Sequence, residues 1–313
     1  MTQNEKKFST RDLDGEARAL IPLVPRLRGR ENKLSPLKGG LTNRNYLLEC
    51  EGERFVLRVM GENSTLLGIN RKAEYACLQA AHDLGIGAEV VAFFPRKGAL
   101  VTRFVTGRVL TGKDLKRSEV LRRVVAALRE YHEKSKGGGT FSAFETVRSY
   151  YSLGRKRNVV FPRNIDHALR MLARIEEERG LPDRVCYCHN DLLSSNLVDG
   201  GRNVWILDWE YGGAGDLFFD LANLAANSLF NCEQEVQLLK CYFGEARSDD
   251  LRRLRLMRLA SDMREAMWGF LQTRISKLNF DYQAYARRHF ERFLKNAKAR
   301  HEFHKLARRE NAL

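Results

Sequence analysis

Residues 186–213 read CYCHNDLLSSNLVDGGRNVWILDWEYGG and combine cysteines, a histidine, asparagines and acids in one short segment. Two apolar runs in it, VCYC before His189 and NVWIL before Asp208, are typical of short β-strands. The polar residues that follow each run are therefore expected in loops at strand ends, where chemistry is often located. A metal site, a redox site and a phosphate-handling loop are the three possibilities.

Three polar side chains follow these strands at a distinctive spacing. Asp191 and Asn196 come after the first run, and Asp208 comes directly after the second. Asp191 is expected to face a substrate hydroxyl. Asn196 and Asp208 offer oxygen ligands, which Mg²⁺ prefers. Phosphoryl transfer needs such a set, because a carboxylate orients the nucleophile and metal ions neutralise the phosphate charge.

The cysteines in the segment also permit a metal site. However, alternation along an apolar strand favours packed thiols at Cys186 and Cys188, and the second ligand pair of a structural zinc site is missing. The chain of 313 residues has six cysteines and starts without an apolar leader, which predicts reduced thiols and a cytoplasmic location. Because no run of about 18 apolar residues occurs, no stable membrane insertion is expected.

The chain is strongly basic, with a formal net charge of +15. Much of the excess lies in the last quarter, in stretches such as YARRHFERFLKNAKARH. Basic residues there alternate with Leu, Met, Phe and Tyr at helical spacing, which indicates amphipathic helices with solvated arginines. No nucleic-acid partner is expected from this pattern.

The order of predicted elements indicates an α+β protein of two domains. Residues 34–60 predict three antiparallel strands, residues 70–84 a helix capped by Asn70, and residues 88–94 and 98–105 two further strands. The first domain is therefore placed at residues 1–105. The second, residues 106–313, is mainly helical, with a helix expected at 118–135 that opens with Ser118 as its cap, and further helices at 164–180, 216–230, 233–243, 248–275 and 281–308.

The sequences HNDLLSSN and ILDWEY resemble the catalytic and metal-binding loops of the protein-kinase-like fold. They are most similar to the choline/ethanolamine kinase and aminoglycoside phosphotransferase branch, and the resemblance covers about residues 34–295. It implies a fold of two lobes, with ATP between a small antiparallel-sheet lobe and a larger helical lobe. It also implies Asp191 as catalytic base, Asn196 and Asp208 as Mg²⁺ ligands, and His189 as a loop-structuring residue.

Upstream residues extend the resemblance to the nucleotide. GGLTNRNY is similar to the phosphate-covering turn of choline kinases, and its backbone N–H groups can hold phosphate oxygens. Arg58 stands where protein kinases have a lysine, and Glu74 would orient it. TRFVTG falls where the hinge and the adenine site are expected. The implied nucleotide-binding residues are Gly40, Leu41, Thr42, Asn43, Arg58, Glu74, Arg103, Phe104 and Val105.

The C-terminal part resembles the closing helices of choline kinases. Trp268 and Tyr285 match aromatic residues that line the choline pocket in that family, and a quaternary ammonium is attracted to aromatic faces. Glu210 and Tyr211, which follow the Mg²⁺ acid, are the other implied substrate-binding residues. Where animal-type enzymes have a second tryptophan, this chain has Glu265.

The resemblance implies transfer of the ATP γ-phosphate to the hydroxyl of a small cationic amino alcohol. Choline is the first candidate, and ethanolamine, thiamine or an aminoglycoside are alternatives within the same family. A basic nucleic-acid or membrane-surface binding protein, related to kinases but inactive, is the alternative of another class. The chain is expected to act as a monomer or a dimer.

Overall fold

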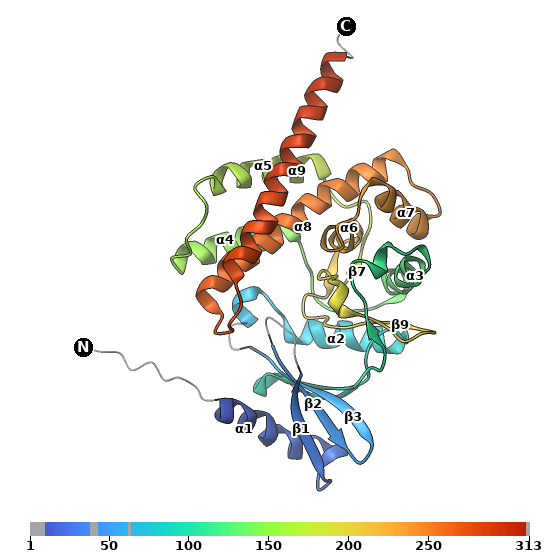
Figure 1. Ribbon diagram of the computed structural model, residues 1–313, viewed down its shortest axis with the longest axis vertical. Coiled ribbons are helices and arrows are strands. Elements are labelled where there is room, and N and C mark those ends of the chain that lie inside the picture. Colours follow the sequence, from blue (N-terminus) through green and yellow to red (C-terminus); the bar gives the residue numbers. More distant parts are fainter. Residues whose placement is uncertain (1–9, 38–42, 62–63, 311–313) are drawn as a thin grey trace, which may run out of the picture. The chain divides into compact units, whose positions relative to one another are not determined.

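The computed structural model describes residues 10–37, 43–61 and 64–310 (Figure 1). The chain forms two compact units. Unit 1 comprises residues up to Ser64 together with Ala88–Val105, and unit 2 comprises Thr65–Gly87 and the chain from Thr106 onward. The helix predicted near residue 75 thus groups with unit 2, whereas the strands that flank it group with unit 1.

Unit 1 is built on one antiparallel sheet. The apolar residues of α1 and of the two 3₁₀ turns after it, among them Leu20 and Leu27, pack with Leu48, Phe55 and Leu57 of the sheet into one core. The mixed α+β class with an antiparallel sheet is therefore confirmed. The elements are α1 (Thr10–Leu20), η1 (Ile21–Leu23), η2 (Pro25–Leu27), η4 (Pro95–Lys97) and, in sheet order, β1 (Asn32–Leu37), β2 (Arg44–Cys50), β3 (Glu53–Val59), β5 (Ala99–Arg103) and β4 (Val90–Phe94).

Helix α2 (Arg71–Asp83) begins where the sequence predicts it. The Asn70 side chain accepts hydrogen bonds from the backbone N–H groups of Lys72 and Ala73, which satisfies two donors of the first turn. The helix packs against the glycine-rich stretch at 137–139, since a Cβ atom on Gly139 would lie only 2.7 Å from that of Ala73. This close approach, together with a φ of 74°, explains why glycine stands there.

Short strands of unit 2 carry the segment of residues 186–213. β7 (Val185–Cys188) pairs with β10 (Gly213–Asp216), and β8 (Leu197–Asp199) lies between β6 (Arg108–Val109) and β9 (Val204–Ile206). The chain between β7 and β8 holds residues 189–196, which include the 3₁₀ turn η6 (Ser194–Asn196). Both acids, Asp191 and Asp208, therefore follow the ends of strands, as the apolar runs predict.

Helix α8 (Ser248–Ile275) is the central helix of unit 2. It is buried without interruption from Leu259 to Gln272 and packs against α4, α5, α6 and α9. Figure 1 shows α8 and α9 crossing side by side, with α9 extending past the other helices of this unit. The remaining elements are η3 (Ser64–Leu67), η5 (Asp114–Lys116), α3 (Ser118–Lys134), α4 (Ala143–Lys156), α5 (Ile165–Arg179), α6 (Leu217–Asn227), α7 (Cys232–Phe243) and α9 (Tyr282–Glu310).

Two local expectations differ from the structure. Ser118 does not cap α3, because the N-cap position is Arg117 and the Ser118 hydroxyl accepts a hydrogen bond from the Gln237 side chain instead. Helix α4 has no counterpart in the predicted elements. The aromatic residues in its sequence weaken helix propensity, and burial of one face against α8 stabilises it instead.

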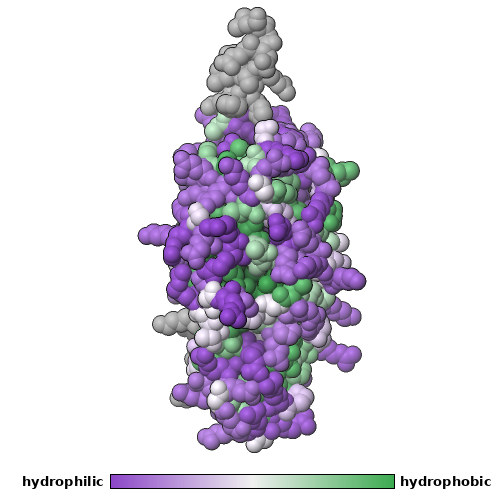
Figure 2. All heavy atoms as spheres, turned by 90° about the vertical axis from the view of Figure 1, so that its right-hand side faces the viewer, coloured by the Kyte–Doolittle hydropathy of each residue, from purple (hydrophilic) through white to green (hydrophobic). Residues whose placement is uncertain are grey.

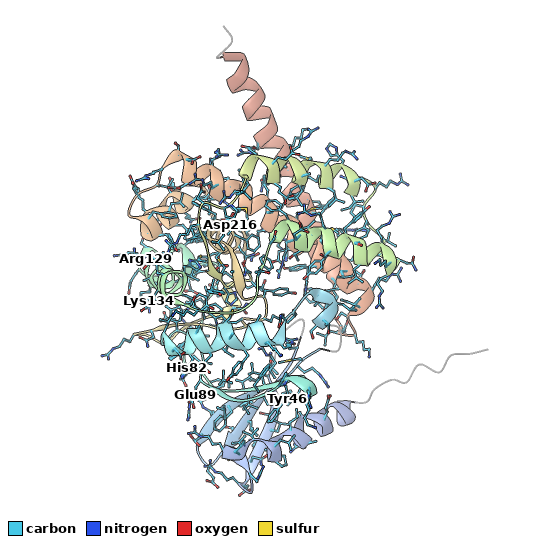
Figure 3. The ribbon with its side chains drawn as sticks, turned by 180° about the vertical axis from the view of Figure 1, so that it is seen from behind. Tyr46, His82, Glu89, Arg129, Lys134 and Asp216 are labelled. Carbon is cyan, nitrogen blue, oxygen red and sulfur yellow. The ribbon has the colours of Figure 1, made fainter. Side chains whose placement is uncertain are left out.

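The surface of the helices is consistent with solvated charge. Arg129 and Lys134 lie on the exposed side of α3 (Figure 3). The face shown in Figure 2 is largely hydrophilic, with hydrophobic residues visible between the charged ones. None of the described helices is both long enough and apolar enough to cross a membrane.

Candidate active site

The loop after β7 begins with a sharp turn at Asn190. Its backbone is in the left-handed region, with a φ of 64°, and the residue is fully buried. Asparagine tolerates this conformation better than most residues. Its side-chain amide donates hydrogen bonds to the carbonyl oxygens of Cys188, Tyr211 and Gly213. These bonds fix the turn and connect it to the segment that follows Asp208.

Asp220, on α6, stabilises the same turn by hydrogen bonds to its backbone. Its carboxylate accepts hydrogen bonds from the backbone N–H groups of His189 (2.7 Å) and Asn190 (2.6 Å) and from the imidazole Nε2 of His132 (3.0 Å). Although burial alone would raise its pKa, the bonds and the charge interactions with His132 and His189 hold the pKa of Asp220 below its ordinary value. The carboxylate is thus a buried anion that organises the loop.

Asp220 and Asn223, both on α6, are not among the site residues predicted from the sequence. The Asn223 side chain accepts the backbone N–H of Leu192 and donates to the Ser261 hydroxyl of α8. A signal existed, since α6 reads LFFDLANLAAN and an acid in so apolar a helix must find a buried partner. The partners of Asp220 could not be named from the sequence, because they are backbone groups about 30 residues away and the imidazole of His132, 88 residues away.

His189 joins the loop to the strand end that carries Asp208. Its Nε2 donates to the carbonyl oxygen of Leu207 at 2.8 Å, so its Nδ1 is free of a proton and accepts the backbone N–H of Asp191. The ring lies 4.7 Å from that of Trp209. Burial lowers the pKa of His189 below its ordinary value, which keeps the imidazole neutral. These contacts agree with the loop-structuring role that the resemblance implies.

Asp191 is almost completely buried, with 9% of its surface exposed. Burial raises the pKa of its carboxyl group to about 7, the nearby charges of Glu265 and Asp208 act in the same direction, and the guanidinium of Arg264 opposes them. Oδ1 accepts a hydrogen bond of 2.9 Å from Arg264. A carboxyl group with a pKa near neutrality is suited to accept a proton from an alcohol.

Asn196 and Asp208 offer the oxygen atoms of the expected metal site. The Asn196 side-chain NH₂ donates to the carbonyl oxygen of Asp191, so its Oδ1 remains available as a ligand. The backbone N–H of Leu207 donates to the Asn196 carbonyl oxygen at 2.8 Å, which keeps the two loops together. Asp208 has a φ of 65°, which turns the chain sharply at the strand end. One amide and one carboxylate oxygen form a donor set that fits Mg²⁺.

Two of the residues predicted to bind the acceptor substrate, Trp268 and Tyr285, lie side by side on α8 and α9. The rings of Trp268 and Tyr285 pack edge to face, with centroids 5.6 Å apart, and the Tyr285 hydroxyl donates to Glu265 at 2.7 Å. The other carboxylate oxygen of Glu265 accepts from Arg264 at 2.7 Å. Glu265 is therefore buried and has partners on both oxygens, which the sequence did not reveal.

Glu210 and Tyr211 are also buried. Glu210 lies 3.5 Å from Arg71 of α2, which in turn pairs with Glu74 at 2.6 Å. The guanidinium carbon of Arg264 lies 4.3 Å from the ring centroid of Tyr211. The resemblance implies that Tyr211 binds a cationic substrate. In the structure, its ring is already in contact with the Arg264 guanidinium.

The residues of unit 1 that are predicted to bind the nucleotide differ in burial and in their interaction partners. Arg58 is buried on β3, and the Asn43 side chain accepts the backbone N–H of Gly61. Arg103 pairs with Glu89 and Glu53 on the sheet surface. The three residues Gly40, Leu41 and Thr42 lie outside the described part of the chain.

Phe104 and Val105, which are predicted to bind the nucleotide, follow β5 in unit 1. A third predicted residue, Glu74, belongs to unit 2. The ring of Phe104 lies 4.6 Å from the Arg54 guanidinium, and Val105 is half-buried. Glu74 belongs to unit 2, where its ion pair is with Arg71. The predicted pairing of Glu74 with Arg58 stays a prediction.

The cysteine strand agrees with packed thiols. Cys186 and Cys188 are buried, unbridged and 3.6 Å apart at their sulfur atoms. Within the described residues, one group of three His, Cys, Asp or Glu side chains has ligand atoms close enough to share a metal ion. It consists of His132, Cys186 and Cys188. Both ring nitrogens of His132 are already engaged, with Asp220 and Tyr242, so we assign no metal to this group.

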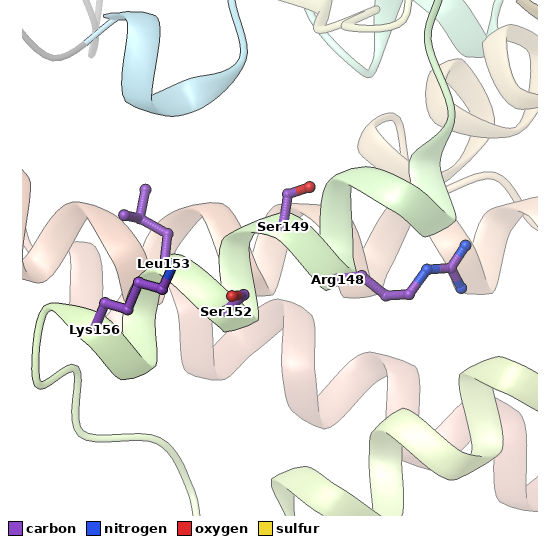
Figure 4. Close-up of a pocket in the computed structure, with 5 residues that line it drawn as sticks. All are labelled: Arg148, Ser149, Ser152, Leu153 and Lys156. Atoms are coloured by element: carbon purple, nitrogen blue, oxygen red, sulfur yellow. The ribbon is translucent and has the colours of Figure 1, made fainter.

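A cavity of about 410 Å³ lies beside α4, away from the residues named so far (Figure 4). None of the predicted site residues lines it, and Arg148 at its rim is paired with Glu145 and Glu176. Its lining residues are Arg148, Ser149, Ser152, Leu153 and Lys156. We assign it no function.

The α+β architecture and the strand-end loop with Asp191, Asn196 and Asp208 define a small-molecule phosphotransferase of the protein-kinase-like fold. The family model described as choline/ethanolamine kinase matches residues 34–241, about two thirds of the chain. The chain therefore belongs to the choline/ethanolamine kinase family, and it is a phosphotransferase with an alcohol group as acceptor. The resemblance inferred from the sequence is confirmed.

Individual relatives agree with this assignment. A solved structure of a choline/ethanolamine kinase family protein from Mesorhizobium loti is 29% identical, with a TM-score of 0.76, and the match covers 91% of this chain and 94% of that one. Probable choline kinase 1 of Arabidopsis thaliana is 27% identical over 82% of this chain and 85% of its own length. Protein LicA of Haemophilus influenzae is 28% identical over 66% of this chain, and the match spans 62% of LicA.

Proposed function

We propose that the protein transfers the γ-phosphate of ATP to the hydroxyl group of a small cationic amino alcohol, in a reaction that depends on Mg²⁺. Choline is the first candidate acceptor. The observation that carries this proposal is the buried Asp191 carboxyl group on the loop after β7, whose backbone carbonyl accepts the Asn196 amide and which shares its strand-end surroundings with Asp208. These groups are the parts that phosphoryl transfer to an alcohol requires.

Each of these side chains has a separate task in the proposed reaction. Asp191 accepts a hydrogen bond from the acceptor hydroxyl through Oδ2, since Oδ1 is held by Arg264, and takes up the proton as the new bond forms. Asn196 and Asp208 hold Mg²⁺, which neutralises charge on the phosphates when it is bound. His189 and Asp220 keep the loop in position for this arrangement. Most of the rate enhancement then comes from orientation and electrostatics.

The aromatic pair on α8 and α9 supports a cationic acceptor. A well-placed aromatic ring is worth about 0.5–2 kcal/mol to an ammonium group. Trp268 packs against Tyr285, and the Arg288 guanidinium already lies 5.4 Å from the Tyr285 ring centroid, so a substrate cation would compete with Arg288 for this ring. Glu210 adds a carboxylate on the loop after the metal site, and Arg71 lies 3.5 Å from it. An ethanolamine acceptor is the second candidate, because its primary ammonium group can donate hydrogen bonds to a carboxylate, whereas the quaternary ammonium of choline has no N–H.

The test is ADP release in a screen of choline, ethanolamine, thiamine and an aminoglycoside. A choline signal at least tenfold above that of ethanolamine, about 1.4 kcal/mol in transition-state stabilisation, would establish choline as the preferred acceptor. The variant Asp191→Asn should lose turnover on every acceptor. Near-normal turnover by this variant would refute its role. Steeply salt-dependent RNA or DNA binding without any turnover would favour a binding protein instead.

A further inference from the structure

Arg264 lies inside the candidate active site but is not one of the site residues predicted from the sequence. It sits in the middle of α8, is 2% exposed, and reaches the catalytic loop through one nitrogen. Nη1 donates to Oδ1 of Asp191 at 2.9 Å and to Glu265 at 2.7 Å. The guanidinium plane is further supported by the ring of Tyr211. An arginine with these contacts has a fixed position.

Most of the hydrogen-bonding capacity of this guanidinium is unused. An arginine carries five N–H groups, and Nη1 accounts for two of them. Nε and Nη2 carry the other three, are buried, and have no hydrogen-bond partner within the described part of the chain. Each buried donor without a partner costs about 1–3 kcal/mol, so the arrangement favours a ligand that supplies acceptor oxygens. The two neighbouring carboxylates, Asp191 and Glu265, hold the pKa of Arg264 well above its ordinary value, and the group stays charged.

The charge and the donor geometry identify the class of ligand. A guanidinium repels the ammonium end of an amino alcohol, whereas it binds phosphate oxygens strongly and in a bidentate manner. In the proposed reaction the hydroxyl oxygen held by Asp191 forms the new bond to the γ-phosphorus. The bond to the oxygen that bridges the β- and γ-phosphates breaks, ADP leaves, and the hydroxyl proton passes to Asp191. The oxygens of the transferred group must therefore pass close to Asp191, which Arg264 contacts.

We propose that Arg264 is a phosphoryl-binding residue, whose Nε and Nη2 groups bind oxygens of the phosphoryl group during transfer and of the phosphomonoester product. This inference rests on the proposed function, because it assumes transfer to an alcohol beside Asp191. Charge stabilisation of a phosphoryl group by an arginine from the same chain can raise the turnover rate by about 10³-fold or more. Glu265 and Tyr285 then serve to hold the guanidinium in place.

The decisive measurement compares two kinds of ligand on one variant. Calorimetric titrations of wild type and Arg264→Gln with phosphocholine, phosphoethanolamine, choline and ethanolamine separate the phosphoryl end of the ligand from its ammonium end. Affinity for both phosphomonoesters should fall at least tenfold in Arg264→Gln, while affinity for both alcohols should stay within threefold or improve. In the ADP-release assay kcat should fall at least 100-fold with little change in the acceptor KM. Arg264→Lys keeps a positive charge but loses the fork, so it should lie between the two.

A matched control is available on α5. Arg179 is also buried, pairs with Asp216 at 2.9 Å and lies over the ring of Phe218. Arg179→Gln should lower the unfolding midpoint as Arg264→Gln does, yet leave the ratio of phosphomonoester to alcohol affinity unchanged. Arg264→Lys serves as the test variant if Arg264→Gln does not fold, because it keeps the charge and most of the side-chain volume.

Equal losses of alcohol and phosphomonoester affinity in Arg264→Gln would overturn the inference and leave Arg264 a residue that only supports the fold. Unchanged phosphomonoester affinity would overturn it as well. Absence of ADP release by wild type with every alcohol would refute the proposed function without deciding the role of Arg264. Titration of wild type and both variants with inorganic phosphate would then still test the guanidinium directly, with weaker binding by the variants as the expected result.

Discussion

Replacement of Asp220 by asparagine should strongly destabilise the protein, because the buried carboxylate anchors the loop that carries Asp191. The carboxylate receives three N–H donors, from His189, Asn190 and His132. An asparagine has one acceptor oxygen, so at least one donor is left facing an NH₂ group, at about 1–3 kcal/mol. The other two bonds lose charge assistance, at about 1 kcal/mol each. The expected loss is about 3–5 kcal/mol, a large part of the stability of a typical domain.

Urea unfolding followed by circular dichroism measures this loss as a shift of the midpoint at constant slope. Glu145→Gln is the control, because Glu145 pairs with Arg148 at 2.6 Å but 70% of its side chain is exposed. Exposed pairs contribute about 0–1 kcal/mol, so the control should unfold almost like wild type. Asp220→Asn should also reduce kcat, since the loop that carries Asp191 loses its anchor. A loss below 1 kcal/mol for Asp220→Asn would refute the reasoning.

Three further outcomes are expected. Asn196→Ala should raise the Mg²⁺ concentration for half-maximal ADP release by roughly 10- to 100-fold, and an unchanged Mg²⁺ dependence would exclude Asn196 as a ligand. Tyr285→Phe keeps the ring but removes the hydroxyl that holds Glu265 beside Arg264, so it should lower kcat more than it raises the acceptor KM, and a rise in KM at constant kcat would contradict this. Burial lowers the pKa of His189 and raises that of Asp191 to about 7, so the two groups change the stability in opposite directions as pH drops. In Asp191→Asn, where the His189 effect remains, the unfolded chain binds the His189 proton more readily, so stability measured by urea unfolding should fall below about pH 6.5, by up to about 1.4 kcal/mol per pH unit. Stability of this variant that is constant between about pH 7.5 and 5.5 would contradict the reasoning.

Much of the local structure follows from the sequence because it depends on neighbouring residues. The Asn70 cap and the turn between β2 and β3 at residues 51–52 are decided within a few residues. The same holds for Asp208, which follows the end of β9, where the apolar run predicts a strand end. Position in the sequence is a reliable guide where the interaction partners are close along the chain.

The predictions that failed involve partners far apart in the sequence. Ser118 bonds to Gln237, more than 100 residues away, instead of capping its own helix. The glycines at 138–139 allow close contact with Ala73 of α2, a contact that the sequence pattern does not reveal. Tertiary contacts decide both of these cases. Helix α4 is different, because a local signal for its start exists: the Ser142 side chain accepts the backbone N–H of Glu145, three residues later.

Glu265 shows how such long-range contacts change a functional interpretation. From the sequence it is an extra acid in a reduced aromatic pocket, available to attract a cation. In the structure its oxygens bind Arg264 and Tyr285, and these bonds, with the positive charges of Arg264 and His289, lower the pKa of Glu265 despite its burial. A carboxylate whose charge is balanced by an adjacent guanidinium adds little attraction for an ammonium group. Glu210, 3.5 Å from Arg71, is balanced in the same way, so selectivity among amino alcohols should depend mainly on the aromatic residues. Glu265→Gln should reduce turnover through Arg264 more than it changes the ratio of choline to ethanolamine use.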